Sequence, residues 1–483
     1  MREQIRRLGA DTAVYGISTI VGRFLNFLLV PIYTHVLPPG EYGIVAYVYS
    51  IIAFVTIIYG YGMESAYFKY ASTKELGDDR ANFSTPFLSL LLTSGLLSLL
   101  ITLFAPQITS SIWLPSGASR IVVYSAWILF FDTITVVPFA SLRLERRARL
   151  FAVLKVLNIV INVAANLVFL LVFHAGVEGI FLSGLIASAA TAVMLLPVIS
   201  AKLQFRMPGE LFKALLRFGL PYMPAGLAAM MIQVGDRLVM KRLTDDATIG
   251  IYQANYRLGI FMMLVVSMYD YAWRPFFLSN AQAPNAKQLF ARILTYFVLA
   301  GTGIVLVLSL FMPDLVAIRI FNRAIIDQRY WGGLSIVPVV LLGYLFLGIY
   351  NNLIAGIYIE KKTGHLPLIT AAGAVVNIAV NFALIPVMGM MGAALATLAA
   401  YLVMAGVLYL VVRRFYPVDY EWKRVGIIAL AGAAVFAAYL YVPPPLPVLL
   451  WKFLLVLLFG ALLGAFGFFN KEEVAGLRKA IGR

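Results

Sequence analysis

The 483-residue chain has no cysteine, three histidines and few charged side chains, which make up 12% of the sequence. Without cysteine there are no disulfides, thiol nucleophiles or thiolate metal sites. No glycine-rich loop ends in Lys-Ser or Lys-Thr, so the sequence shows no means of hydrolysing a nucleotide. A soluble domain is about a quarter charged, so a chain with 12% charged and 62% hydrophobic residues is expected to be solvated mainly by lipid.

The abundant hydrophobic residues predict an all-α polytopic membrane protein. At about 20 residues per crossing of a ~30 Å hydrocarbon layer, they suffice for about fourteen spans. Breaks at Pro, Gly and charge clusters place the predicted helices near 13–36, 43–68, 83–105, 120–142, 150–173, 177–200, 213–240, 247–272, 289–312, 333–359, 366–387, 390–412, 424–442 and 447–469.

Basic residues outnumber acidic ones by 38 to 22. We interpret this excess as the bias that keeps basic loops on the cytoplasmic side of a membrane, not as a nucleic-acid surface. With the amino terminus inside, 27 of the basic residues fall in predicted cytoplasmic segments and 7 in the opposite ones. The sequence therefore predicts that both termini are cytoplasmic.

The first twelve predicted helices form two groups of six, and an internal repeat is visible in the second half of each group. An Asn-x-x-x-Asn motif followed by Gly-x-x-Gly occupies 162–179 and occurs again in 377–392, about 215 residues later. Asparagines four apart share a helical face, so we expect each pair to bond a neighbouring helix. Glycine permits close backbone approach, so we expect tight turns at the Gly-x-x-Gly motifs.

A second repeated feature lies near the start of each group of six helices. Gly43 and Gly250, 207 residues apart, are each followed by isoleucine in a similar local sequence. Matched repeats of this kind are common in transporters. The repeat predicts two pseudo-symmetric six-helix lobes around a central cavity, with boundaries 1–205 and 206–415, followed by two extra spans and a tail in 416–483.

Several segments together resemble one family. The stretch 377–397 is similar to the signature of the eleventh and twelfth helices of polysaccharide transporters in the multidrug/oligosaccharidyl-lipid/polysaccharide (MOP) exporter superfamily, which includes the O-antigen flippases. Gly22-Arg23 with 34–43 resembles the first hairpin of that family, and Asp236-Arg237 with Gly250-x-Tyr252 resembles a later part. The resemblance covers essentially the whole chain.

The resemblance implies a flippase without enzymatic activity. Its substrate would be an undecaprenyl-diphosphate-linked oligosaccharide, moved from the inner to the outer leaflet by alternating access. The implied setting is cell-surface polysaccharide biosynthesis in a bacterial or archaeal cytoplasmic (inner) membrane, with polysaccharide polymerase machinery as a partner.

Charged residues in the middle of spans are costly and usually face a cavity. Arg23 and Arg257 lie about ten residues into the first and eighth predicted helices. A guanidinium group matches the oxygens of a diphosphate, so we expect both to bind substrate; the alternative is a structural Arg. Arg237 and Lys241 share a face with Gln233 and extend this basic set, either at a cavity mouth or at a solvated helix end. Lys155 is also included in the set.

Lys155 and Lys452 lie close enough to predicted helix ends for their ammonium groups to reach the headgroups, which is the alternative to a cavity role. Acids in or near spans are the hypothetical sites of proton or sodium coupling: Asp236, Glu64, Asp132 and Asp270. Asp270 also has a local explanation, an ion pair with Arg274 four residues away. The histidines are dispersed, so we expect neither a metal site nor a bound cofactor.

Two other functions remain open at this stage. A cation-coupled multidrug antiporter of the same superfamily would need acids in its cavity, whereas the first helix carries Arg23 and no acid between Asp11 and Glu41. A membrane-embedded glycan polymerase would normally need a large loop, and the longest predicted loops, 106–119 and 313–332, are short.

Overall fold

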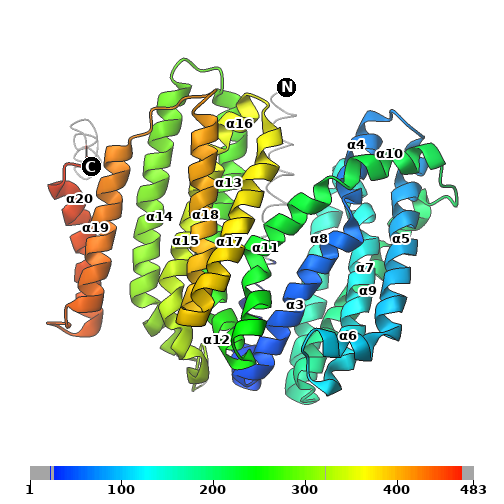
Figure 1. The fold of residues 1–483 in the computed structure, drawn as a ribbon, viewed down its shortest axis with the longest axis horizontal. Coiled ribbons are helices and arrows are strands. Elements are labelled where there is room, and N and C mark those ends of the chain that lie inside the picture. The colour runs from blue at the N-terminus through cyan, green and yellow to red at the C-terminus, as the bar shows by residue number, and fades with distance from the viewer. Residues whose placement is uncertain (1–21, 23–24, 26, 321, 470–483) are drawn as a thin grey trace. The chain divides into compact units, whose positions relative to one another are not determined.

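The computed structural model describes residues 22, 25, 27–320 and 322–469, which are almost entirely helical (Figure 1). In this part of the chain, thirteen helices are long and apolar enough to cross a membrane. They coincide with all the predicted spans except the one near 13–36, most of which lies outside the described residues; α2 (Leu29–Val36) is its end. The predicted all-α polytopic fold is confirmed.

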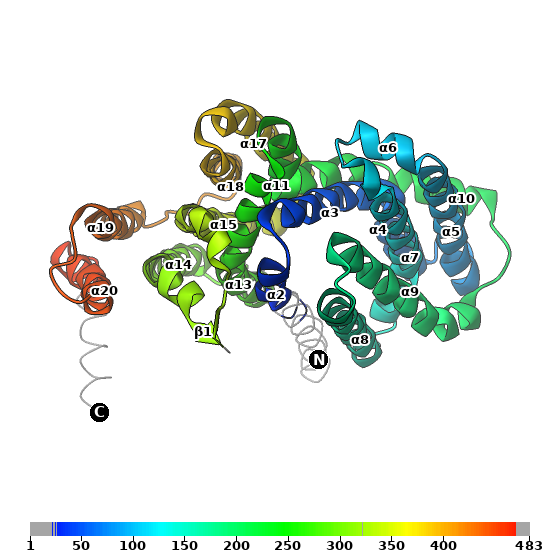
Figure 2. The ribbon, with the colours of Figure 1, turned by 90° about the horizontal axis from the view of Figure 1, so that it is seen from below.

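Contacts divide the chain into two compact units, the first of which consists of residues up to Arg257 with Ile326–Gly332 and Asn377–Ala393. In this unit α7 packs against α5 and α9, and α8 packs against α9 (Figure 2). Besides α2, its helices are α3 (Pro39–Gly60), α4 (Met63–Thr73), α5 (Asp79–Leu103), α6 (Ala105–Ser111), η1 (Ser116–Ala118), α7 (Ser119–Leu144), α8 (Ala148–Leu167), the π-helix η2 (Val168–Val172), α9 (Gly176–Lys202), α10 (Gly209–Gly219), α11 (Tyr222–Leu243) and α12 (Asp246–Tyr256).

The second unit consists of Leu258–Ile325, Gly333–Val376 and the chain from Ala394 onward. Here α14 packs against α15, α19 and α20, and α13 packs against α15. The elements after α12, some of which cross the unit boundary, are η3 (Arg257–Gly259), α13 (Ile260–Asn280), α14 (Ala286–Ala317), β1 (Arg319–Ile320), β2 (Arg323–Ala324), η4 (Gln328–Ile336), α15 (Val337–Leu353), α16 (Ala355–Ile359), η5 (Thr363–His365), α17 (Leu366–Met388), α18 (Met390–Val412), α19 (Trp422–Tyr441) and α20 (Val448–Ala465).

The two segments expected to be plain loops contain regular structure. Residues 106–119 hold most of α6 and all of η1. The 313–332 segment holds the end of α14 and an antiparallel hairpin in which Arg319 pairs with Ala324. The units group residues by contact, whereas the predicted lobes are defined by a repeat, so the boundaries 1–205, 206–415 and 416–483 stay a prediction.

Helix starts follow local sequence rules. Pro39 occupies the first turn of α3, where its missing N–H costs no hydrogen bond. Asp78 caps α5 by accepting a bond of 2.6 Å from the Ala81 amide. Asp245 caps α12 by accepting a bond of 2.8 Å from the Thr248 amide, and this backbone hydrogen bond lowers the pKa of Asp245.

Several predicted spans are divided into two or more helices, and in the second and seventh spans the breaks meet. The second span divides into α3 and α4 at Gly62, whose φ of 74° favours glycine. The seventh divides into α10 and α11 after Gly219. A Cβ on Gly62 would lie only 2.1 Å from the carbonyl oxygen of Gly219, so the absence of a side chain permits this contact.

The repeat-related glycines Gly43 and Gly250 face each other where α3 crosses α12. A Cβ on Gly43 would lie 1.8 Å from the carbonyl oxygen of Asp246, and one on Gly250 would lie 1.9 Å from that of Pro39. The backbone amides of the two glycines are also close to the partner's Cβ position, at 3.1 and 2.9 Å. Small residues allow such close crossing of helices in membranes, and here the two repeat-related residues make the crossing reciprocally.

Candidate functional site

Arg237 and Asp236 form a buried ion pair on α11. Their side chains are 4% and 0% exposed, and Arg237 Nη1 lies 2.7 Å from Asp236 Oδ1. Arg237 Nε donates to Gln253 Oε1 at 3.0 Å, and the Tyr252 hydroxyl donates to Asp236. The guanidinium also lies 4.2 Å from the ring centre of Tyr256. Both charges therefore have partners within the protein, and the pair ties α11 to α12.

The rest of the predicted basic stripe is largely engaged as well. Lys241 Nζ lies 2.5 Å from Asp246 Oδ1, and the Lys241 side chain is 8% exposed. Gln233 is exposed, and its carbonyl oxygen accepts a bond of 2.9 Å from Arg237 Nη1. A substrate role for Arg237 and Lys241 stays a prediction, and the geometry favours their structural role.

A different set of charges lies exposed in the first unit. Asp132 on α7 and Lys155 on α8 are both exposed, and each interacts electrostatically with the other. Asp132 is close to the hydroxyl of Ser188 on α9. Lys155 Nζ lies 4.1 Å from the ring centre of Phe139. Three adjacent helices therefore bring a carboxylate and an ammonium group to one exposed region.

Arg257, which ends the longest segment of this unit, is exposed where the short helix η3 begins. Its charge acts on the phenol groups of Tyr33, Tyr42 and Tyr49. Tyr49 is influenced by Asp132 as well, so it links Arg257 to the exposed charges of α7 and α8. The set of Arg257, Lys155 and Asp132 carries two cations for one anion, which suits an anionic group.

The remaining predicted site residues are elsewhere or outside the described part. Arg23 lies outside the described residues. Glu64 on α4 contacts Arg143 at the end of α7. Asp270 on α13 pairs with Arg274 at 3.0 Å, in the second unit, which confirms the expected local pair. The exposed set thus includes Arg257, Lys155 and Asp132, but neither Glu64 nor Asp270.

Lys452 has a partner that the sequence did not indicate. Its side chain is 4% exposed, and its Nζ lies 2.5 Å from Asp314 Oδ2. This ion pair joins α20 to α14. The sequence analysis missed it because it placed Asp314 in a loop, whereas α14 continues to Ala317.

Comparisons with solved structures identify the fold. An inward-closed lipid II flippase MurJ superposes with a TM-score of 0.71 at 16% identity, covering 94% of this chain and 98% of that one. An inward-facing MATE family multidrug resistance transporter of the MOP superfamily gives 0.65 at 16% identity, covering 81% and 94%. An outward-facing MATE transporter gives 0.59 at 16% identity, covering 84% and 95%. The chain has the membrane-transporter fold that these structures share.

The family follows from the sequence. A family model described as polysaccharide biosynthesis protein matches residues 8–280, more than half of the chain. The chain therefore belongs to the polysaccharide biosynthesis protein family. A comparison with curated proteins finds no match.

Proposed function

We propose that this protein flips an undecaprenyl-diphosphate-linked oligosaccharide from the inner to the outer leaflet by alternating access. The observation that carries the proposal is the exposed pair of cations, Arg257 and Lys155, within membrane-spanning segments. Charged side chains in such segments are costly and are retained where they serve a substrate or ion. Family membership supports a role in polysaccharide biosynthesis, and the fold is one that a lipid II flippase also has.

The proposed membrane location and partners follow from the proposed flippase function. The protein would act in a bacterial or archaeal inner membrane with both termini cytoplasmic, next to polysaccharide polymerase machinery, and would catalyse no covalent reaction. A diphosphate would be held by guanidinium and ammonium groups, with Arg23 joining Arg257 and Lys155. The isoprenyl tail would remain among the acyl chains.

The test is reconstitution into liposomes with a fluorescent lipid-linked oligosaccharide, comparing Arg257→Gln, Lys155→Gln and Arg23→Ala with the wild type. A charge-assisted hydrogen bond contributes about 1.5–3 kcal/mol, so each loss is expected to slow flipping by about tenfold or more. The matched control is Arg149→Gln, an exposed residue at the start of α8, which should flip normally. Equal rates in all these proteins would remove the cations from the mechanism.

Asp132 is the acid that we propose for ion coupling. Among the described residues, Asp236, Glu64 and Asp270 each have an arginine partner within 4 Å, whereas Asp132 has no basic group within that distance. A carboxylate without a tight partner is free to exchange a proton or sodium ion. Asp132→Asn should make flipping independent of an imposed pH or sodium gradient; an unchanged gradient dependence would exclude this role.

The alternative function is a cation-coupled multidrug antiporter, favoured by the likeness to MATE transporters. The same liposomes distinguish the two. An antiporter would move an organic cation such as ethidium, and Lys155→Gln would leave that transport intact or improve it. A flippase would move the lipid-linked glycan and leave ethidium outside.

A further inference from the structure

A pocket of about 220 Å³ lies between α8 and α9 in the first unit, apart from the exposed charges described above. Two of its lining residues, Arg147 and Lys202, are basic. The others are apolar: Leu150, Leu154, Met194, Pro197, Val198 and Ala201.

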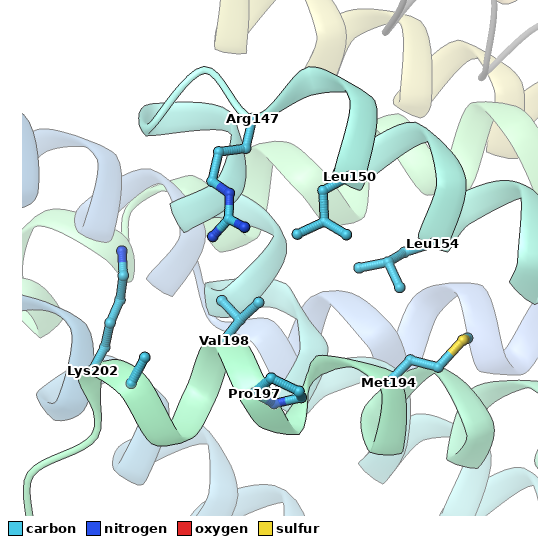
Figure 3. A pocket seen from close by; sticks show the side chains of 8 residues that line it. Arg147, Leu150, Leu154, Met194, Pro197, Val198 and Lys202 are labelled. Carbon is cyan, nitrogen blue, oxygen red and sulfur yellow. The ribbon is translucent and has the colours of Figure 1, made fainter.

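Basic and apolar lining residues are separated along the helices. Arg147 immediately precedes α8 and Lys202 is the last residue of α9, so both cations lie where the two helices end. Leu154 and Met194 lie about two turns further into the helices. Figure 3 shows Arg147 and Lys202 toward one side of the pocket and Leu154 and Met194 toward the other. The pocket therefore has a cationic end at the helix termini and an apolar end deeper in the span.

The cationic end keeps a positive balance. Glu145 is the acid near both cations: it contacts Lys202 and lies 4.0 Å from Arg147 Nη1. Lys202 Nζ also lies 2.6 Å from Ser141 Oγ. The Arg147 side chain is 52% exposed. Among the described residues, one carboxylate within 4 Å therefore serves two cations, while Asp79 acts on Lys202 from further away. The start of α8, which no described side chain caps, adds a partial positive charge.

The surface around the pocket is hydrocarbon-like. Val153 and Leu157 on α8 are 54% and 40% exposed, and Val193 and Leu196 on α9 are 62% and 54% exposed. In a membrane-spanning segment such residues face acyl chains. A molecule that reaches the pocket from this side comes from the bilayer and carries its charge at one end.

We propose that this pocket binds an anionic phospholipid of the bilayer, with its phosphate between Arg147 and Lys202 and part of one acyl chain along the apolar lining. Basic pockets between spans bind anionic headgroups by this combination of charge and hydrocarbon contact. The volume suits a stretch of one chain, not a whole lipid. The proposal does not depend on the proposed flipping activity, because neither Arg257 nor Lys155 lines the pocket.

Native mass spectrometry of the full chain in detergent tests the proposal, with added phosphatidylglycerol and, separately, zwitterionic phosphatidylethanolamine. Each basic residue near an anionic lipid contributes enough to change affinity about fivefold. Arg147→Gln with Lys202→Gln should therefore weaken phosphatidylglycerol binding about 20- to 30-fold. The matched control removes two charges outside the pocket, Arg149→Gln with Arg206→Gln, both exposed, and should bind within twofold of the wild type.

A steric variant keeps the test decisive if the double variant folds poorly, since Lys202 also contacts Glu145. Ala201→Phe fills the pocket and keeps both charges, and it should lose phosphatidylglycerol binding to a similar degree. Equal binding by the double variant and its control would overturn the proposal. So would equal binding of phosphatidylethanolamine, or displacement of phosphatidylglycerol by equimolar undecaprenyl phosphate, which would assign the pocket to the isoprenyl lipid.

Discussion

The hairpins α8–α9 and α17–α18 contain two copies of one sequence motif, and the first copy is two residues longer than the second. Asn166 is followed by Gly176 ten residues later, whereas Asn381 is followed by Gly389 eight residues later. Both glycines adopt the same backbone conformation, with φ of 52° and 54°. The first hairpin takes up its extra length in the π-helix η2, whereas α17 runs as an α-helix to Met388. The insertion is thus absorbed in the helix end, and the turn is kept.

The same contact closes both hairpins, but at different distances. A Cβ on Gly392 would lie 2.5 Å from the backbone carbon and oxygen of Leu384. At the equivalent Gly179, a Cβ would lie 3.0 Å from the Cβ of Ala175 and 3.1 Å from that of Phe169. Gly179 therefore has slightly more room than Gly392. We infer that the π-helix provides this room and that the second hairpin depends more strictly on its glycine.

The asparagine pairs differ in their partners. Asn166 accepts a bond of 2.9 Å from the Tyr33 hydroxyl, so the first pair bonds a neighbouring helix as expected. Asn381 donates to Asn377 Oδ1 at 3.0 Å, but among the described residues Asn377 Nδ2 and Asn381 Oδ1 have no partner. The polar motif is kept in both copies, and its contribution to stability is expected to differ.

The largest effect is expected at the other repeat-related pair, the glycines at which α3 and α12 cross. Gly43→Ala and Gly250→Ala each place a methyl group within 2 Å of a backbone carbonyl oxygen, so each should cost more than about 3 kcal/mol. Thermal unfolding in detergent and the yield of monodisperse protein measure this loss. Gly60→Ala on α3, with no atom within 4 Å of its Cβ, is the control. If one substitution is tolerated and the other is not, the two glycines do not contribute equally to the crossing of α3 and α12.

The next largest effect is a difference in stability loss between the glycines of the two hairpins. Gly392→Ala should lower the free energy of unfolding by about 2–3 kcal/mol, and Gly179→Ala by about 1 kcal/mol, because only Gly392 faces rigid backbone. The melting temperature of each variant checks the order. Gly406→Ala on α18 has open space at its Cβ and should change little. Equal losses at the two hairpin glycines would show that the π-helix gives no extra room.

The spans and the repeat could be predicted from the sequence because apolar runs and glycine spacing act locally. The thirteen described spans, the turns at Gly176 and Gly389 and the local pair of Asp270 with Arg274 all follow from such patterns. Partners from distant segments could not be predicted in this way. The pairing of Lys452 with Asp314 joins residues 138 positions apart, and no local spacing indicates it.

The candidate site shows the same limit. Sequence reasoning identified Arg257, Lys155 and Asp132 as charges in spans, but it treated Arg237 and Lys241 as equals of these. Their difference is one of burial and pairing: Arg237 is 4% exposed beside Asp236, whereas Arg257 is exposed. Tyr49, which links Arg257 to Asp132, was missed because one tyrosine among 26 carries no signal of its own.

A smaller difference in the free energy of unfolding is expected between variants of the two asparagine pairs. Asn166→Leu removes the bond from the Tyr33 hydroxyl on another helix as well as the bonds to Asn162 and should cost about 2–3 kcal/mol, whereas Asn381→Leu removes one bond, to Asn377 on its own helix, and should cost about 1 kcal/mol. Tyr33→Phe serves as the matched control, since it removes the bond between Tyr33 and Asn166 alone. In a double-mutant cycle the losses of Tyr33→Phe and Asn166→Leu should not add. Additive losses, or a larger loss at Asn381, would contradict the comparison.

The smallest effect is expected from removing the insertion itself. Deletion of Leu171 and Val172 gives the first hairpin the length of the second and should convert η2 to a regular helix end. Because these side chains are 48% and 68% exposed, little packing is lost, and the expected cost in the free energy of unfolding is about 1 kcal/mol or less. The deletion of Phe382 and Ala383, in the copy without a π-helix, is the control and should be far more harmful.

The informative measurement combines the deletion with Gly179→Ala. If η2 is what keeps the first hairpin open, its removal brings the residue at position 169 closer to Gly179, as Leu384 is to Gly392. The cost of Gly179→Ala should then rise from about 1 kcal/mol toward the 2–3 kcal/mol expected at Gly392. An unchanged cost in the shortened protein would mean that the spacing of α8 and α9 is set by other contacts, and that the two extra residues have no part in it.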